Sequence, residues 1–241
     1  MKRVVILTLL AGAVAHGQPQ SFDVIIRNGT VIDGSGNPRY AAAVGIRSGF
    51  IAAIGDLDSA TAATNIDARG LFVAPGFINI HSHASADALP TAVNMLTQGV
   101  TTEIFNADGN GPLNVAQQMG ALAVPGLAIN IGGYIGFNAA WINVVGSADR
   151  RASSDEIVRM RALIANGLSQ GAWGVSAGLD YKPAYFANTE EVIQVVDVAR
   201  PARTNFTNHD RVTPESNFSS KAGVAGTVAI VVSTMVNDRP G

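Results

Sequence analysis

The distribution of hydrophobic and polar residues divides the chain into two parts. Between residues 22 and 70, short apolar runs alternate with polar residues and end at turns rich in glycine, asparagine and proline, a pattern typical of β-strands. We expect strands at residues 22–28, 29–33, 43–47 and 50–54, with a turn at residues 34–38. This part predicts a small β domain over residues 21–70.

From residue 71 onward, apolar runs of strand length alternate with segments that have a helical spacing of apolar residues. Such an alternation is typical of βα units that build a parallel sheet. We count five units, with strands expected at residues 71–80, 101–106, 127–135, 172–177 and 205–208, and helices at residues 89–97, 113–122, 155–168, 189–200 and 221–236. The residues from 71 to 241 therefore predict an α/β domain.

The helix expected at residues 155–168 has the clearest start signal. Ser153 or Ser154 can cap it, and two acidic residues follow at the positive end of the helix dipole. The apolar residues at helical spacing are Ile157, Met160, Leu163 and Ile164. We interpret this stripe as core and assign it no chemistry.

The first twenty residues are typical of a signal peptide followed by a flexible start. A basic segment, Met1–Arg3, precedes an apolar run from Val4 to Ala13 and the small residues of Ala13-Val-Ala15. The apolar run is too short for a permanent membrane anchor; the alternative is a buried first strand. We expect export, to the periplasm or out of the cell.

Composition and charge narrow the function classes. The chain has 241 residues, of which 47% are hydrophobic and 14% charged, enough for a large core. A formal net charge of -2 without clusters of lysine and arginine argues against nucleic acid or an anionic membrane surface as a partner. Because the chain contains no cysteine, a bound metal would be held by histidine and carboxylate groups.

The clearest chemical signal is a pair of histidines at the end of an apolar run. His81 and His83 are two residues apart, so in a strand both side chains project to the same side and can converge on one metal ion. Two ordinary strand-end histidines are the alternative. The strand follows Pro75-Gly76, and we expect it to be buried because it contains Phe77, Ile78 and Ile80.

Three motifs extend this signal over most of the chain, from about residue 22 to residue 223. They are Pro75-Gly-Phe-Ile-Asn-Ile-His-Ser-His83, Gly99-Val-Thr-Thr-Glu103, and Gly171-Ala-Trp-Gly-Val-Ser-Ala-Gly-Leu-Asp-Tyr-Lys-Pro-Ala184 with Thr189-Glu-Glu191 after it. In combination they resemble the metal-dependent amidohydrolase superfamily, specifically its D-aminoacylase (N-acyl-D-amino-acid deacylase) branch. The resemblance implies a partial (β/α)8 TIM-type barrel of about five βα units over residues 71–241, preceded by a β-sandwich segment at residues 21–70.

The resemblance also implies a set of metal ligands. Beside His81 and His83, Asp108 stands where many D-aminoacylases carry a cysteine ligand, and His209 matches the histidine of a (Ser/Asn)-His-x-Arg segment. A carboxylate can replace a thiolate on zinc and would tolerate other divalent ions. Asp108 could instead be a turn residue in a glycine-rich loop, and His209 a solvated loop histidine.

Two further residues follow the fourth expected strand. Tyr181 and Lys182 could meet the carboxylate of a substrate, or could serve packing in a loop rich in proline and tyrosine. The strand itself ends without a lysine, so the carbamylated-lysine bridge of dihydroorotase- and urease-type relatives is not visible. This favours the deacylase branch.

The reaction that the resemblance implies is zinc-dependent hydrolysis of the amide bond of an N-acyl-D-amino acid, a small-molecule substrate. One or two divalent ions would lower the pKa of bound water toward about 7 and polarise the acyl carbonyl. Hydantoins or isoaspartyl dipeptides are alternative substrates, because loops set specificity in this fold.

Length complicates this interpretation. A full barrel takes about 250 residues, whereas residues 71–241 account for five units, so we expect a truncated N-terminal portion or a non-catalytic fragment. The family's proton-transferring aspartate on strand eight has no counterpart, and residues 228–241 do not match its sixth strand; no catalytic residue is therefore assigned. An open sheet would expose apolar edges and favour self-association.

Overall fold

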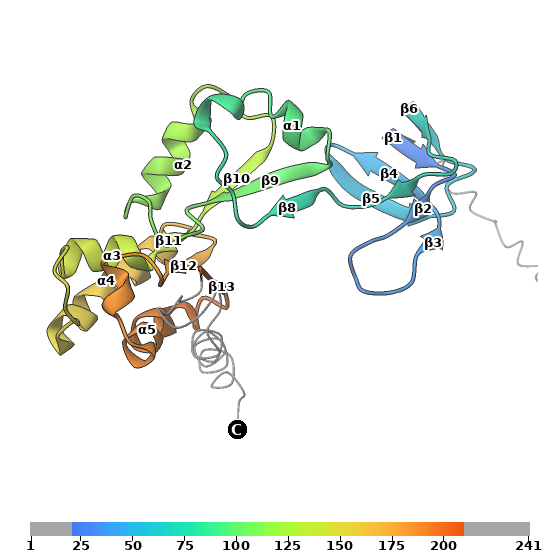
Figure 1. The fold of residues 1–241 in the computed structure, drawn as a ribbon. Helices are drawn as coiled ribbons and strands as arrows, with labels where there is room; N and C mark the ends of the chain where they lie inside the picture. Colours follow the sequence, from blue (N-terminus) through green and yellow to red (C-terminus); the bar gives the residue numbers. More distant parts are fainter. Residues whose placement is uncertain (1–20, 210–241) are drawn as a thin grey trace, which may run out of the picture. The chain divides into compact units, whose positions relative to one another are not determined.

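A computed structural model describes residues 21–209 of the chain (Figure 1). The chain divides into two compact units, Met1–Pro75 and Gly76–Gly241, and each is considered by itself. The expected signal peptide at residues 1–20 and the expected helix at residues 221–236 lie outside the described residues and stay predictions. Within residues 21–209, no helix is long and apolar enough to cross a membrane.

The first unit contains two small β-sheets. The strand order of the larger is β5-β4-β1-β6, formed by β1 (Ser21–Arg27), β4 (Ala43–Arg47), β5 (Phe50–Gly55) and β6 (Thr61–Asp67). The smaller has the order β3-β2-β7, formed by β2 (Thr30–Val31), β3 (Tyr40–Ala41) and β7 (Phe72–Val73). Ser48 and Gly49 connect β4 to β5 with φ values of 52° and 79°, as a two-residue type I′ turn requires. The strands expected at residues 22–28, 43–47 and 50–54 are confirmed.

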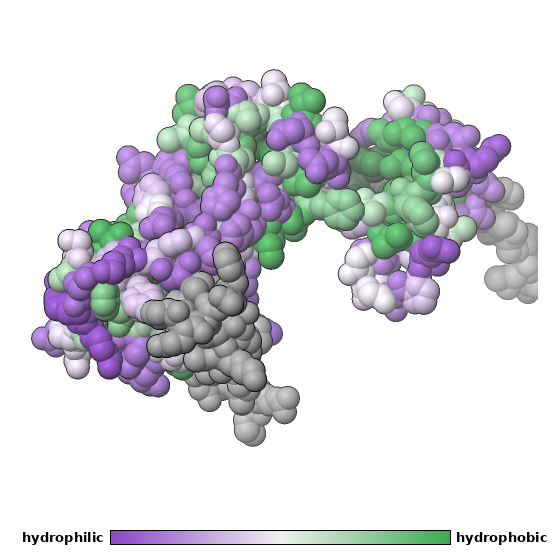
Figure 2. Space-filling view, in the orientation of Figure 1, coloured by the Kyte–Doolittle hydropathy of each residue, from purple (hydrophilic) through white to green (hydrophobic). Residues whose placement is uncertain are grey.

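Strand β6 was not predicted, because its sequence lacks an alternation of apolar and polar residues. Its side chains are almost all exposed, and what holds it is parallel pairing with β1, from Ser21 opposite Thr61 to Arg27 opposite Asp67. The core of this unit is small: Phe22 and Ile25 of β1 pack with Leu57 and Ala60. Figure 2 shows hydrophobic residues at the surface of this unit, and the exposed ones include Phe50, Ile51, Ile54 and Ile66.

The second unit is a mixed α/β structure. Its strands are β8 (Phe77–Asn79), β9 (Val100–Phe105), β10 (Asn130–Gly133), β11 (Ile135–Gly136), β12 (Gly174–Gly178) and β13 (Asn205–His209). Its longer helices are α2 (Val115–Ala123), α3 (Phe137–Val144), α4 (Ser154–Ser169) and α5 (Thr189–Val196), and its shorter ones are η1 (Ala86–Ala88), α1 (Val93–Leu96), η2 (Ala184–Phe186) and η3 (Asp197–Ala199).

All the strand pairs of this unit are parallel, and the strands follow one another in chain order. They form two three-stranded sheets, β8-β9-β10 and β11-β12-β13. Only Tyr134 separates β10 from β11, so the expected third strand passes from one sheet to the other (Figure 1). Residues 76–209 form no closed barrel.

The main core lies between the second sheet and helices α3, α4 and α5. Trp141 of α3, Met160 and Ile164 of α4, Val175 of β12 and Val192 of α5 are fully buried in one cluster. The predicted apolar stripe of α4 is confirmed, since Ile157 joins this core as well and Leu163 packs against it. This core holds β11 and β12 in place, and β12 leads directly into the loop that contains Asp180 and Tyr181.

The strand expected at residues 71–80 is two strands. Residues 72–73 belong to β7 of the first unit, and residues 77–79 form β8 of the second. The interruption lies at Pro75, which has no amide hydrogen, and Gly76, whose backbone approaches Thr101 so closely that a Cβ would lie 2.1 Å from its Oγ1.

The expectation that this strand is buried was wrong. Phe77, Ile78 and Ile80 have exposed fractions of 62%, 48% and 53%. The reason is that β8 is only three residues long and forms the edge of its sheet, paired with β9 alone. The open parallel sheet and its exposed apolar residues agree with the sequence-based expectation. Self-association through these residues stays a prediction.

Two helices differ from the sequence-based prediction. Of the helix expected at residues 89–97, only α1 forms, because Pro90 restricts the preceding residue and Ala92 has a left-handed φ of 42°. Helix α3 was missed altogether. Its residues Phe137, Asn138, Ala140 and Trp141 are all buried, so it shows no amphipathic stripe by which the pattern could identify it.

Helix α4 begins where the sequence predicts a serine cap, and Ser153 forms it as part of a capping box. The Ser153 hydroxyl accepts a hydrogen bond from the Glu156 amide, and the Glu156 carboxylate accepts one from the Ser153 amide. Arg150 donates two further hydrogen bonds to that carboxylate, at 2.7 and 2.8 Å. The Arg150 guanidinium, and after it the Ser153 amide, lower the pKa of Glu156 from its ordinary value of 4.5 to about 2.

We expect Glu156→Gln to lower the melting temperature at pH 7. A carboxyl group whose pKa is lowered by folding stabilises the folded state above its unfolded pKa, and this contribution is lost as the pH falls from about 4.5 to about 2. Because glutamine retains the capping box, the variant isolates the charge. Melting curves at pH 7, 5, 4 and 3 should show the difference between the two proteins shrinking below pH 4.5; a constant difference would contradict this explanation.

Candidate metal centre

The predicted ligands come from the carboxyl ends of strands in two parallel sheets, β8-β9-β10 and β11-β12-β13. His81 and His83 follow β8, Asp108 follows β9, and His209 is the last residue of β13. In a parallel sheet the carboxyl ends of the strands lie at the same edge, where α/β proteins form their sites. The structure therefore brings together residues that are far apart in the sequence.

His81, His83 and Asp108 form a compact group. The distance from His81 Nε2 to Asp108 Oδ1 is 3.3 Å, and that from His83 Nε2 to Asp108 Oδ2 is 3.2 Å. One ligand atom from each residue lies within 4.8 Å of those of the other two. The imidazoles are well exposed, at 48% and 68% of their side-chain surface, whereas the Asp108 side chain is 18% exposed.

The donor set and its surroundings fit a divalent metal ion. Asp108 Oδ1 is shielded from solvent and has no hydrogen-bond partner within residues 21–209, although buried polar atoms normally have one. It faces His81 Nε2 at 3.3 Å and His209 Nδ1 at 3.8 Å. Imidazole nitrogen and carboxylate oxygen are typical ligands of zinc.

His209 lies beside this group rather than within it. Its Nδ1 is near Asp108 and accepts or donates a short hydrogen bond with the Tyr181 hydroxyl, while its Nε2 lies 3.6 Å from Asp180 Oδ2. Burial, and then the charges of Asp180 and Asp108, raise the pKa of Tyr181. The structure thus brings Tyr181 and His209 close to Asp108, while their roles as substrate-binding residue and metal ligand stay predictions. Sequence reasoning did not name Asp180, whose signal was its place directly before Tyr181.

Lys182 does not lie against the histidine group. Its Nζ pairs with Asp149 Oδ2 at 2.7 Å, and both side chains are mostly exposed. An exposed ion pair of this kind contributes little to stability, so it does not commit Lys182 to a structural role. A role of Lys182 toward a substrate carboxylate stays a prediction.

Close backbone contacts position Asp108. Its neighbour Gly109 has a φ of 80°, and a Cβ there would lie 2.2 Å from the Asn138 side chain and 2.8 Å from the Gly178 amide. The Gly109 amide donates to the Ser176 hydroxyl at 3.1 Å, and that hydroxyl donates to the Asn106 carbonyl. Only glycine fits such a turn, so the loop after β9 is held against β12 and α3.

The segment that carries the histidines is tied down along its backbone. The His81 amide donates to Asn79 Oδ1 at 3.2 Å, the Ser82 amide donates to the Ile104 carbonyl at 3.0 Å, and the buried Tyr134 donates its hydroxyl hydrogen to the Ile80 carbonyl at 3.1 Å. These contacts come from two neighbouring strands and from the junction of the two sheets. They restrict where the two imidazoles can lie.

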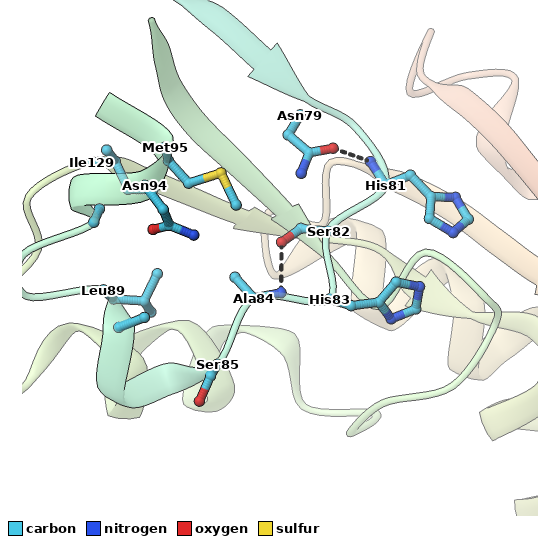
Figure 3. A pocket seen from close by; sticks show the side chains of 12 residues that line it. Asn79, His81, Ser82, His83, Ala84, Ser85, Leu89, Asn94, Met95 and Ile129 are labelled. Atoms are coloured by element: carbon cyan, nitrogen blue, oxygen red, sulfur yellow. Dashed lines mark hydrogen bonds between the residues drawn. The ribbon is translucent and has the colours of Figure 1, made fainter. Parts of the chain in front are cut away.

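A cavity of about 480 Å³ adjoins the histidine segment. Its apolar lining includes Leu89, Met95 and Ile129, with Asn94 and Ser85 as polar members. Figure 3 shows that the imidazoles of His81 and His83 point away from these residues. The imidazoles therefore do not point into this cavity, and we assign no bound molecule to it.

Comparisons with known proteins identify relatives of this chain. The chain is 34% identical over 207 residues to a D-aminoacylase of Alcaligenes xylosoxydans xylosoxydans, and 34% identical over 210 residues to an N-acyl-D-aspartate deacylase of the same organism. These matches cover 76% and 77% of this chain and 43% and 42% of the relatives. A solved structure of D-aminoacylase superposes on 88% of this chain with a TM-score of 0.75 and 32% identity.

The chain belongs to the D-aminoacylase branch of the amidohydrolases. It spans about half the length of the D-aminoacylases that it matches. The N-acyl-D-glutamate deacylase of Bordetella bronchiseptica, solved with zinc and a phosphonate inhibitor, matches 89% of this chain and 50% of its own at a TM-score of 0.77 and 28% identity. No family model matches the sequence. The resemblance predicted from the three motifs is thus confirmed.

Substitution of Asp108 tests its assignment as the counterpart of the D-aminoacylase cysteine. We expect Asp108→Ala to weaken zinc binding by about tenfold or more, on the order of the loss seen when a metal site is disturbed, and Asp108→Cys to retain it, because thiolate and carboxylate both neutralise the ion. Competition with a chromophoric chelator measures the affinity, and in the cysteine variant cobalt should show thiolate charge-transfer absorption.

Asp149→Ala is the matched control, since it removes an exposed carboxylate that pairs with Lys182. It should leave zinc affinity unchanged. Equal zinc affinities for the wild type, Asp108→Ala and Asp108→Cys would show that Asp108 is a turn residue and not a metal ligand.

Proposed function

We propose that this chain supplies the metal-binding part of a zinc-dependent hydrolase that cleaves the amide bond of N-acyl-D-amino acids. The observation that carries the proposal is the convergence of His81, His83 and Asp108 within 4.8 Å at the ends of β8 and β9. The identities of 34% to a D-aminoacylase and to an N-acyl-D-aspartate deacylase support it.

The protein groups have separate tasks in this proposal. His81, His83 and Asp108 would hold a zinc ion, and His209 would be available for the same or a second ion. When bound, such an ion polarises the acyl carbonyl and lowers the pKa of water at the site. Tyr181, whose hydroxyl bonds to His209, would orient the substrate beside the ligands.

The relatives support an N-acyl amino acid as substrate. The two Alcaligenes relatives are named for D-amino acid and D-aspartate deacylation. The Bordetella enzyme carries a phosphonate that mimics the tetrahedral intermediate of its reaction. A D-hydantoinase structure matches at 23% identity and a TM-score of 0.55, a likeness of fold alone, so hydantoins serve as the comparison ligand in the test.

Two measurements on the purified 241-residue chain test this function. First, elemental analysis should find zinc in the wild type and a loss of zinc in the His81→Ala/His83→Ala variant. Second, N-acetyl-D-methionine should raise the melting temperature of the zinc-loaded protein more than the L-enantiomer or a 5-substituted hydantoin does, because a ligand stabilises the state that binds it.

Hydrolysis by this chain alone should be slow. The residues that match the branch include metal ligands but none that it assigns to protonation of the leaving amine, and general acid–base catalysis is typically worth about 10² to 10⁴-fold. Zinc binding without selectivity for N-acyl-D-amino acids would refute the deacylase assignment and leave the metal centre standing. Turnover at an enzyme-like rate that His81→Ala abolishes would show that this chain completes the site by another residue.

A further inference from the structure

A buried carboxyl group is connected to the segment that carries His81. Glu103 of β9 pairs in register with Asn79 of β8, and its exposed fraction is 0%. Its Oε2 accepts a hydrogen bond from Asn79 Nδ2 at 2.9 Å. Its Oε1 is shielded from solvent and has no hydrogen-bond partner within the described part of the chain.

Packing alone does not account for an acidic residue at this position. The next residues of β9, Ile104 and Phe105, are apolar and buried, and an apolar side chain at position 103 would avoid the cost of burying a carboxyl group. A buried polar group with an unpartnered atom needs another explanation. The hydrogen bond to Asn79, its single one among residues 21–209, provides one.

Asn79 transmits the constraint to His81. The two ends of its amide differ, since the oxygen accepts and the nitrogen donates. The oxygen accepts from the His81 backbone amide at 3.2 Å, while the nitrogen donates to Glu103. Because Glu103 Oε2 accepts from Asn79 Nδ2, the amide is held in the orientation that presents its oxygen to His81.

We propose that Glu103 is a positioning residue for the metal centre. By setting the orientation of the Asn79 amide, it fixes the backbone at His81 and thereby the imidazole that faces Asp108. The inference rests on the proposed metal-binding function. It concerns which group donates and which accepts in the hydrogen bonds that lead from the His81 amide through Asn79 to Glu103. Substitution can reverse the direction of the bond between positions 79 and 103.

The test is a polarity swap in the full chain, with zinc affinity as the measurement. Groups that support metal ligands are typically worth about 10 to 100-fold in affinity, so we expect losses of that size for Asn79→Asp, which sets two carboxylates against each other, and for Glu103→Leu. Glu103→Gln, which can accept or donate, should fall between these variants and the wild type. The double variant Asn79→Asp/Glu103→Gln restores one acceptor for His81 and one donor from position 103, and should return to within about threefold of the wild type.

A second readout separates positioning from general stability. The visible absorption of the cobalt-loaded protein, which reports ligand geometry, should change in Asn79→Asp and revert in the double variant. Glu156→Leu is the matched control: it removes another buried glutamate of the same unit, whose partners are Arg150, Arg159 and Ser153. It should lower the melting temperature without changing zinc affinity.

The outcomes are distinguishable. Absence of zinc from the wild type would refute the proposed function itself. Zinc affinity in Asn79→Asp equal to that of the wild type, or a double variant no better than Asn79→Asp alone, would refute the role of Glu103 while the metal centre stands. If Glu103→Leu does not fold, Asn79→Asp and the double variant, which conserve side-chain volume, still decide.

Discussion

The close approach of backbones at Gly109 is the constraint on which the candidate metal centre depends. The turn after β9 touches the Asn138 side chain and the Gly178 amide, at distances that leave no room for a Cβ. Asn138 in turn exchanges two hydrogen bonds with Gly178, at 2.8 and 2.9 Å. Because this contact locks the loop against β12 and α3, the Asp108 carboxylate lies at one defined place among three histidines.

The site therefore depends on the core of the second unit. Helices α3, α4 and α5 bury Trp141, Met160 and Val192 against β11 and β12, and this packing fixes the wall against which the Asp108 loop lies. The His81 segment, in contrast, extends from the edge strand β8, where Phe77 and Ile80 are exposed. Its position depends on hydrogen bonds more than on burial, through Asn79, Tyr134 and the Ile104 carbonyl.

Sequence reasoning identified the parts of the site whose signal is local. His81 and His83 were recognisable as a candidate pair from a two-residue spacing at the end of an apolar run. Outside the site, the start of α4 was recognisable from a serine followed by two acidic residues. Glu103 and Asp180 were not assigned a role, because their significance lies in which strands become neighbours. A glutamate in Val-Thr-Thr-Glu is unremarkable until β9 pairs with β8 and sets it beside Asn79.

The arrangement of strands also explains why a metal ion would matter for the fold itself. His81, His83 and Asp108 follow strands of the sheet β8-β9-β10, whereas His209 ends a strand of the sheet β11-β12-β13. The two sheets are joined through Tyr134, whose hydroxyl donates to the Ile80 carbonyl and lies 3.4 Å from the amide nitrogen of Asn205 in β13. An ion held by ligands from both would add to the contacts that already cross this junction, such as that of the Gly109 amide with the Ser176 hydroxyl. Since metal binding is coupled to folding, the free energy of binding would stabilise the contact between the sheets as well as the site.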